Sequence, residues 1–68
     1  MMYIMKIKGK FKIPDYIQLR NENYILVAYF RADRQPKGLE KFGWGDKEAE
    51  FQQLVENLPF GILQEINL

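Results

Sequence analysis

The side chains of this chain that could do chemistry are carboxylates, amines and phenols, because the sequence holds no histidine, cysteine, serine or threonine. It therefore lacks thiol and aliphatic hydroxyl nucleophiles, and no side chain has an ordinary pKa near neutrality. Structural zinc sites rely on thiolate and imidazole ligands, and both are missing. This inventory predicts a protein that is not an enzyme and that holds no metal and no cofactor.

No arrangement of the carboxylates indicates a catalytic pair. Asp15 follows a proline in a predicted turn, and Asp46 occupies the position of a helix N-cap. Glu48 and Glu50 lie two residues apart on the predicted helix, so their side chains point in different directions. The glycines within 42–45 lack the spacing of a phosphate-binding loop. No catalytic residue is predicted.

Four lysines occupy alternate positions near the start of the chain: Lys6, Lys8, Lys10 and Lys12. On a strand they would project to one side about 6.6–7 Å apart, close to the spacing of phosphates along a nucleic-acid strand. The simpler interpretation is a solvated face that discourages edge-to-edge pairing. Nucleic-acid platforms place exposed rings among the cations, whereas Phe11 is expected on the opposite, apolar side. If this face has a partner, we therefore favour an acidic protein surface, with nucleic acid as the alternative.

Phe42 and Trp44 are further candidate partner-binding residues. They lie beside glycines just before the predicted helix, where a ring is either an exposed anchor or a lid over the core. Tryptophan is frequent among the residues that dominate binding energy at interfaces. Both interpretations remain open for these two residues.

Alternation with a period of two predicts the first strands. A strand over 4–13 is followed by a loop over 14–16, which would pair Ile13 with Ile17 and lead into a second strand over 16–20. The residues expected on the buried side of the first strand are Met5, Ile7, Gly9, Phe11 and Ile13.

The segment 24–32, which follows a predicted turn over 21–23, is apolar on both faces. That pattern is typical of a central strand. With one helix in the chain, the second side of the sheet has nothing obvious to cover it, and uncovered apolar surface marks interfaces. The candidate partner-binding residues on this uncovered side are Ile25, Val27 and Tyr29.

The second half of the chain predicts one helix. A turn over 35–38 leads to residues 39–44, which are either a loop or a fourth strand. The helix is expected to run from its N-cap, Asp46, to Leu58 before a proline, and a last strand over 62–68 follows. The apolar stripe that should face the sheet consists of Phe51, Leu54, Val55 and Leu58.

These elements predict a single α+β domain over residues 1–68, with a small, mostly antiparallel sheet of four or five strands and one helix packed on one face. A domain of this size buries only about 60% of its unfolded surface. Since no disulfide can form, stability requires a dense core or association, and the 47% hydrophobic and 15% aromatic content makes a dense core feasible.

Charge is distributed unevenly along the chain. Residues 1–34 hold seven basic and three acidic residues, whereas residues 35–68 hold three basic and six acidic residues. This asymmetry fits opposite faces of one domain or a head-to-tail contact between copies. The net charge of +1 is too small for a dedicated nucleic-acid binder. No apolar run approaches a membrane span and no signal-peptide pattern is present, so we expect a cytoplasmic protein without a membrane partner.

Together these features predict a small non-catalytic protein-interaction module, an accessory or regulatory protein. Its expected partner is another protein or a second copy, bound through the uncovered side of the sheet as a homodimer. The alternative is a nucleic-acid-associated protein that uses the lysine face of the first strand. A second alternative is a small subunit of a larger enzyme complex whose partner chain supplies the chemistry.

Overall fold

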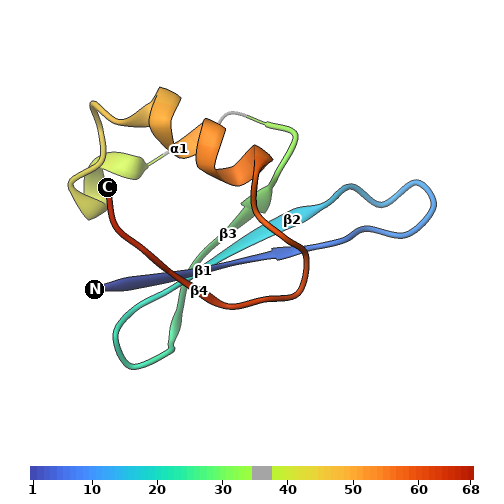
Figure 1. Ribbon diagram of the computed structural model, residues 1–68, viewed down its shortest axis with the longest axis horizontal. Coiled ribbons are helices and arrows are strands. Elements are labelled where there is room, and N and C mark those ends of the chain that lie inside the picture. Colours follow the sequence, from blue (N-terminus) through green and yellow to red (C-terminus); the bar gives the residue numbers. More distant parts are fainter. Residues whose placement is uncertain (35–37) are drawn as a thin grey trace.

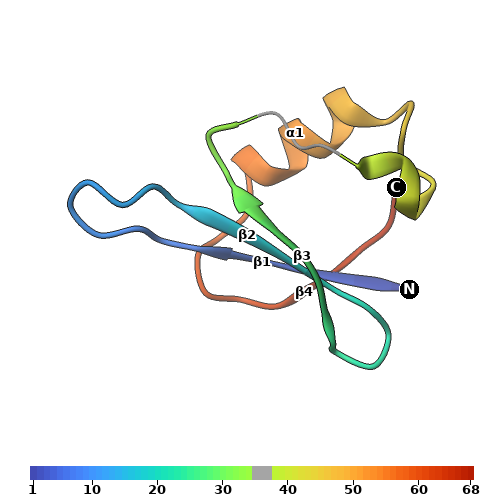
Figure 2. The same ribbon diagram turned by 180° about the vertical axis from the view of Figure 1, so that it is seen from behind.

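A computed structural model describes residues 1–34 and 38–68, which fold into one antiparallel sheet with helices on one side (Figures 1 and 2). The sheet order is β3-β2-β1-β4, and every neighbouring pair is antiparallel. The predicted α+β class is confirmed. The elements are β1 (Met2–Ile7), β2 (Tyr16–Arg20), β3 (Leu26–Arg31), the 3₁₀ helix η1 (Leu39–Phe42), α1 (Glu48–Glu56) and β4 (Gln64–Ile66).

The helix side of the sheet is set by Ile4 of β1 and by Ile17 and Leu19 of β2. All three are almost fully buried, and Ile4 lies opposite Leu19. Because side chains alternate along a strand, Lys6 shares this side, directly opposite Ile17, and Met5 points the other way. The predicted buried side of the first strand is therefore wrong: the even positions, not the odd ones, face the helix.

The first hairpin also differs from the prediction. Strand pairing stops at Ile7 opposite Tyr16, so residues 8–15 form a long loop in place of the three-residue loop over 14–16. The expected pairing of Ile13 with Ile17 is absent because Ile17 lies opposite Lys6. Phe11 has a left-handed backbone (φ 55°), which ends the extended conformation that the alternation predicted.

Strand β3 lies at the edge of the sheet. The central position predicted from its doubly apolar pattern is therefore wrong. The strand begins at Leu26 because the preceding residues form a turn around Asn21. The Asn21 side-chain carbonyl accepts hydrogen bonds from the backbone N–H groups of Asn23 (2.9 Å) and Ile25 (3.1 Å). The chain enters β3 through a bulge, since the pairing with β2 shifts by one residue.

Residues 39–44 do not form a strand. Leu39–Phe42 is the 3₁₀ helix η1, flanked by Gly38 and Gly43, whose left-handed φ angles of 80° and 79° suit glycine. The turn expected over 35–38 lies outside the described residues except for Gly38.

The boundaries of α1 and β4 are shorter than predicted. The N-cap of α1 is Lys47 and not Asp46, and no side chain caps the helix. The helix ends at Glu56, because the backbone N–H of Asn57 bonds to the carbonyl of Leu54 in a tighter turn. The last strand spans Gln64–Ile66 in place of 62–68.

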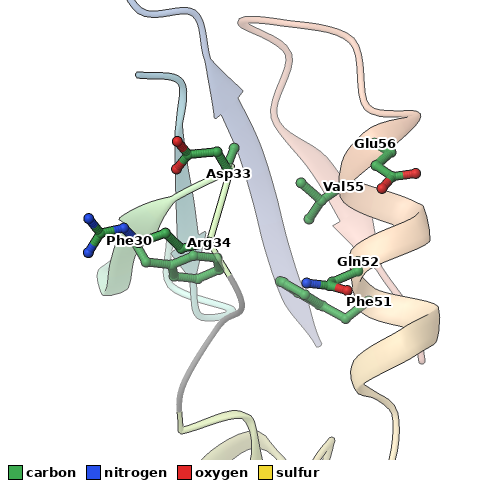
Figure 3. Close-up of a pocket in the computed structure, with 8 residues that line it drawn as sticks. Phe30, Asp33, Arg34, Phe51, Gln52, Val55 and Glu56 are labelled. Carbon is green, nitrogen blue, oxygen red and sulfur yellow. The ribbon is translucent and has the colours of Figure 1, made fainter. Parts of the chain in front are cut away.

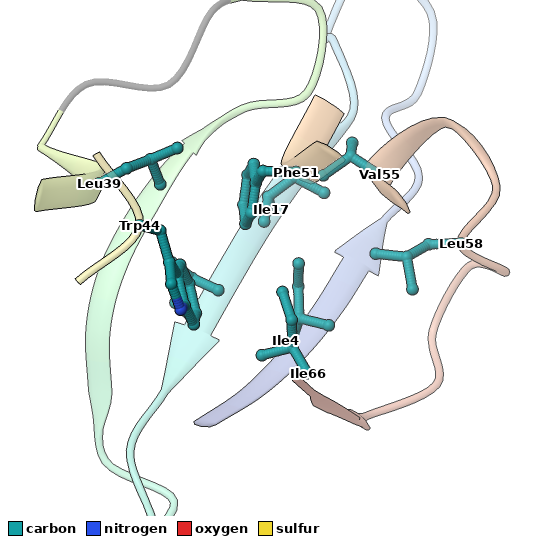
Figure 4. Close-up of a cluster of buried hydrophobic side chains, with 9 residues drawn as sticks. Ile4, Ile17, Leu39, Trp44, Phe51, Val55, Leu58 and Ile66 are labelled. Atoms are coloured by element: carbon teal, nitrogen blue, oxygen red, sulfur yellow. The ribbon is translucent and has the colours of Figure 1, made fainter. Parts of the chain in front are cut away.

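The core lies between α1 and the sheet (Figure 4). Phe51 is fully buried at its centre, with the rings of Phe30 and Trp44 each 5.9 Å from its own ring. The predicted apolar stripe is confirmed: Phe51 and Val55 of α1 are buried, Leu54 packs against the core, and Leu58 is buried just after the helix ends. The buried residues of the core are Ile4, Ile17, Leu19, Leu39, Trp44, Phe51, Val55, Leu58 and Ile66.

Phe51→Ala is expected to lower the free energy of unfolding by about 3–5 kcal/mol, because it removes a fully buried ring and leaves a cavity. Urea denaturation followed by circular dichroism measures this loss. A loss below about 1 kcal/mol would contradict the placement of Phe51 at the centre of the core.

Asp46→Ala is the matched control at the helix start. Asp46 is exposed and precedes the N-cap, so its removal is expected to change stability by less than about 0.5 kcal/mol. A loss near 1 kcal/mol in the same denaturation assay would instead indicate that Asp46 caps the helix.

Candidate protein-interaction surface

The side of the sheet that faces away from α1 and η1, which we call the open face, carries all four tyrosines of the chain. Strand alternation places Tyr3, Tyr16 and Tyr29 on this face, and the ring of Tyr24 stacks on that of Tyr3. Neither described helix covers it (Figure 1). The same face also carries Met5, Ile7, Gln18, Arg20, Leu26 and Arg31.

The tyrosines form two pairs that lie toward opposite ends of β2. The ring centroids of Tyr3 and Tyr24 are 4.8 Å apart with an interplanar angle of 30°, and those of Tyr16 and Tyr29 are 4.8 Å apart at 56°. Tyr24 and Tyr29 are 55% and 51% exposed despite these contacts. Mutual packing restricts the rings before any partner arrives, which reduces the conformational entropy that binding would remove.

Two arginine side chains of the open face are held in place by hydrogen bonds. One guanidinium nitrogen of Arg20 donates to the backbone carbonyl of Tyr24 at 2.8 Å, and another donates to the Gln18 side chain at 3.1 Å. Arg31 forms a two-point ion pair with Asp33, with N–O distances of 3.0 and 2.7 Å. The hydrogen bond from Arg31 lowers the pKa of the Asp33 carboxyl, and the same bond raises the pKa of Arg31. Both guanidinium groups are therefore fixed in orientation, and the charge of Arg31 is paired with that of Asp33.

The phenol of Tyr3 has a pKa above its ordinary value. The main cause is its interaction with the Tyr24 side chain, and the negative charge of Glu65, opposite Tyr3 on β4, acts in the same direction. Tyr3 therefore remains neutral, and able to donate a hydrogen bond, over a wider pH range than a free tyrosine.

The open face continues onto the exposed edge of the sheet at β3. Ile25, Leu26 and Val27 are 58%, 43% and 42% exposed in succession, and the outer side of β3 pairs with no described strand. An edge strand with apolar side chains is a template for a partner strand or for a face-packing partner. The sequence-predicted residues Ile25, Val27 and Tyr29 are therefore all exposed, and all three lie at this edge.

The lysine row does not form one flat charged face. The Lys6 ammonium group donates to the Val55 carbonyl at 3.0 Å and lies 5.0 Å from the centre of the Phe60 ring. Lys8 lies 5.9 Å from the same ring, and Lys10 and Lys12 lie in the loop of the first hairpin. Lys6 is thus a structural residue at the C-terminal end of α1, where the helix dipole favours a cation.

Trp44 and Phe42 belong to the region of the core under η1. Trp44 is only 7% exposed, and the half-buried Phe42 ring packs against it at 5.5 Å. The indole therefore serves as a lid over the core and is not accessible as an anchor.

A cavity lies between the end of β3 and α1 (Figure 3). It has a volume of about 180 Å³ and is lined by Phe30, Arg34, Phe51 and Glu56 among others. This volume is smaller than the roughly 300–1,000 Å³ typical of small-molecule sites. A wider and more open hollow of about 360 Å³ is lined by Lys6, Pro14, Asp15, Ala32 and Asp33. Within residues 1–34 and 38–68, no group of three acidic side chains is placed to hold a metal ion, and no helix has the length and apolar character needed to cross a bilayer.

Comparison with known proteins gives no further guidance, since no family model, no curated protein and no solved structure matches the chain. The interpretation of the site therefore depends on its own residues.

Sequence reasoning missed Tyr3, Tyr16, Tyr24 and Arg20 as members of the open face. The signal was present in the second strand: once Ile17 and Leu19 are assigned to the buried side, Tyr16 and Arg20 must point to the other.

Lys6→Met is expected to lower the free energy of unfolding by about 1–2 kcal/mol, because it removes a charged donor from a partly buried carbonyl but keeps the apolar stem. The exposed Lys12 provides the control, and Lys12→Met should change stability by less than about 0.5 kcal/mol. Equal effects of the two substitutions in urea denaturation would contradict the structural role of Lys6.

Tyr24→Phe is expected to lower the pKa of Tyr3 toward its ordinary value, because it removes the main interaction that raises it. A raised pKa means that the fold favours the neutral phenol: this stabilisation is complete below the ordinary pKa and is lost as the pH rises through the raised value. NMR titration of the Tyr3 ring signals in the wild type and in the variant measures the two pKa values. An unchanged Tyr3 pKa in the variant would contradict the coupling.

Proposed function

We propose that this protein is a small non-catalytic protein-interaction module and that the open face of its sheet is the binding surface. The observation that carries the proposal is the gathering of all four tyrosines, in two closely packed pairs, on the side of the sheet that neither described helix covers. The lack of histidine, cysteine, serine and threonine supports a non-catalytic role. The absence of cysteine also fits the cytoplasm, which we propose as its location.

The composition of the open face supports a protein as the partner. Tyrosine, methionine and arginine are enriched at protein interfaces, and tyrosine and arginine are frequent among the residues that dominate binding energy. Met5 lies between the two tyrosine pairs and Arg20 lies beside the Tyr3–Tyr24 pair, so the enriched residue types are adjacent and not scattered. In a domain of this size, apolar surface left open on one face also limits stability, which a partner would restore.

A second copy of the chain is the partner that we favour. An isologous contact places the same surface on both sides, so a face with both charge signs can match itself across a twofold axis. The open face has this mixture, with Arg20 at the end of β2 opposite Tyr3 and Glu65 on β4 on the other side of Tyr3. The edge strand β3 would lie within or beside such a contact.

Nucleic-acid binding by a lysine face of the first strand has less support, because the four lysines do not lie on one strand face. Lys6 is engaged by the end of α1, and Lys10 and Lys12 lie in a loop and not on a strand face. No observation specifically favours the second alternative, a small subunit of an enzyme complex.

Sedimentation equilibrium at micromolar to millimolar concentrations tests the proposal. The wild-type protein is expected to associate to a dimer, and Tyr29→Glu is expected to weaken this association at least about tenfold, because it buries a charge in the contact. Ile62→Glu is the matched control, since Ile62 is 50% exposed and Tyr29 is 51% exposed, but Ile62 lies in the segment before β4 and is not one of the residues that define the open face.

A wild-type protein that stays monomeric over the whole range would contradict self-association. In that case, capture experiments from the native host with wild type and Tyr29→Glu compare binding to other proteins. Equal sets of captured proteins would contradict the open face as the binding surface.

A further inference from the structure

The loop of the first hairpin is a second surface, separate from the open face. Residues 8–15 extend beyond the paired parts of β1 and β2 and form one end of the molecule along its 34 Å longest axis (Figures 1 and 2). The loop has internal hydrogen bonds: the N–H of Ile13 donates to the carbonyl of Lys10 at 2.9 Å, and the N–H of Gly9 donates to the Asp15 carboxylate at 2.8 Å. Its tip is therefore a defined turn.

The tip presents apolar side chains to solvent. Phe11 is completely exposed and adopts a left-handed φ of 55°, and Ile13 is 62% exposed. A left-handed backbone is unfavourable for a phenylalanine, and glycine or asparagine would suit the turn better. The fold thus holds a large ring away from the core at a position where the backbone alone would select another residue.

The same loop is strongly cationic. Lys8, Lys10 and Lys12 are exposed, and residues 7–14 contain no acidic residue. The carboxylate of Asp15 accepts a hydrogen bond from the loop backbone, and the two ion pairs of the described residues, Arg31–Asp33 and Lys47–Glu50, lie elsewhere. Three cations therefore surround two exposed apolar side chains at the end of the molecule.

We propose that this hairpin binds the surface of an anionic lipid bilayer, with Phe11 and Ile13 entering the interface and the lysines contacting the headgroups. Such a surface supplies negative charge directly above an apolar layer, and the tip has the complementary arrangement. Juxtamembrane lysines contribute about 1 kcal/mol each at such surfaces, and long lysine side chains reach the headgroups while neighbouring residues insert.

Other partners fit the hairpin less well. A stable protein interface uses about 20–30 residues a side, many more than the tip provides. Single-stranded nucleic acid is bound on platforms where successive bases stack on several rings, and the loop contains one ring, Phe11. Ile13 has no role in such stacking. The expectation of no membrane partner was based on the lack of a spanning segment, which peripheral binding does not require.

Cosedimentation with vesicles tests the proposal. We expect binding to phosphatidylcholine vesicles that contain phosphatidylserine, weaker binding at high salt and little binding to pure phosphatidylcholine vesicles. Phe11→Gly should weaken binding at least about tenfold, because it removes the inserting ring. Glycine suits the left-handed backbone, so this variant should fold at least as well as the wild type.

Charge placement is tested with two double variants of equal net charge. Lys10→Gln with Lys12→Gln should weaken vesicle binding about thirtyfold, whereas Arg34→Gln with Lys41→Gln should have less than about a threefold effect. Tyr29→Glu should bind vesicles as the wild type does, which separates this site from the open face.

Several results would overturn the proposal. They are no binding of the wild type to anionic vesicles at low salt, equal losses in the two double variants, or full binding by Phe11→Gly. Complete displacement of the protein from vesicles by an equal phosphate concentration of single-stranded oligonucleotide would also overturn it, in favour of nucleic acid.

Discussion

The structure depends on one constraint: a sheet has two faces, and residues 1–34 and 38–68 contain a single α-helix with which to cover them. Phe51 fixes the choice, because its fully buried ring seats α1 on the side of the sheet that carries Ile17 and Leu19. The strand residues at the alternate positions then point away from the core. The exposure of the tyrosines follows from this single packing interaction, as a consequence of strand alternation and not of any local preference.

The helix and the second strand could be predicted from the sequence because their periodicity was unambiguous. The stripe from Phe51 to Leu58 repeats with the helix period, and Ile17 and Leu19 are the only apolar residues of their strand apart from a tyrosine. The phase of the first strand could not be predicted in this way. Met5 and Ile7 lie on the open side, Phe11 and Ile13 lie in the loop beyond the strand, and the buried side is set by Ile4 before them.

Lys6 explains why the alternation of the first strand predicted the wrong buried side. A lysine on the buried side of a small sheet is unusual, and it is tolerated here because its ammonium group reaches the Val55 carbonyl and the Phe60 ring at the margin of the core. These partners lie about fifty residues away along the chain, a separation that local patterns cannot encode. The same limit applies to β3, whose apolar faces predicted a central position although the turn around Asn21 and the bulge place it at the edge.

The candidate site was predicted in part. Tyr29, Ile25 and Val27 are exposed as expected, whereas Trp44 is buried because the turns around η1 bring it over Phe51. The tyrosines that complete the open face come from three separate segments, so only the fold brings them together. Association through the open face is tested most directly by the NMR spectrum of the tyrosine rings over a range of protein concentrations. The ring signals of Tyr3, Tyr16, Tyr24 and Tyr29 are expected to shift or broaden as the concentration rises, while those of Phe51 remain constant. Tyrosine signals that do not change, together with changes at residues of the helix side, would contradict association through this face.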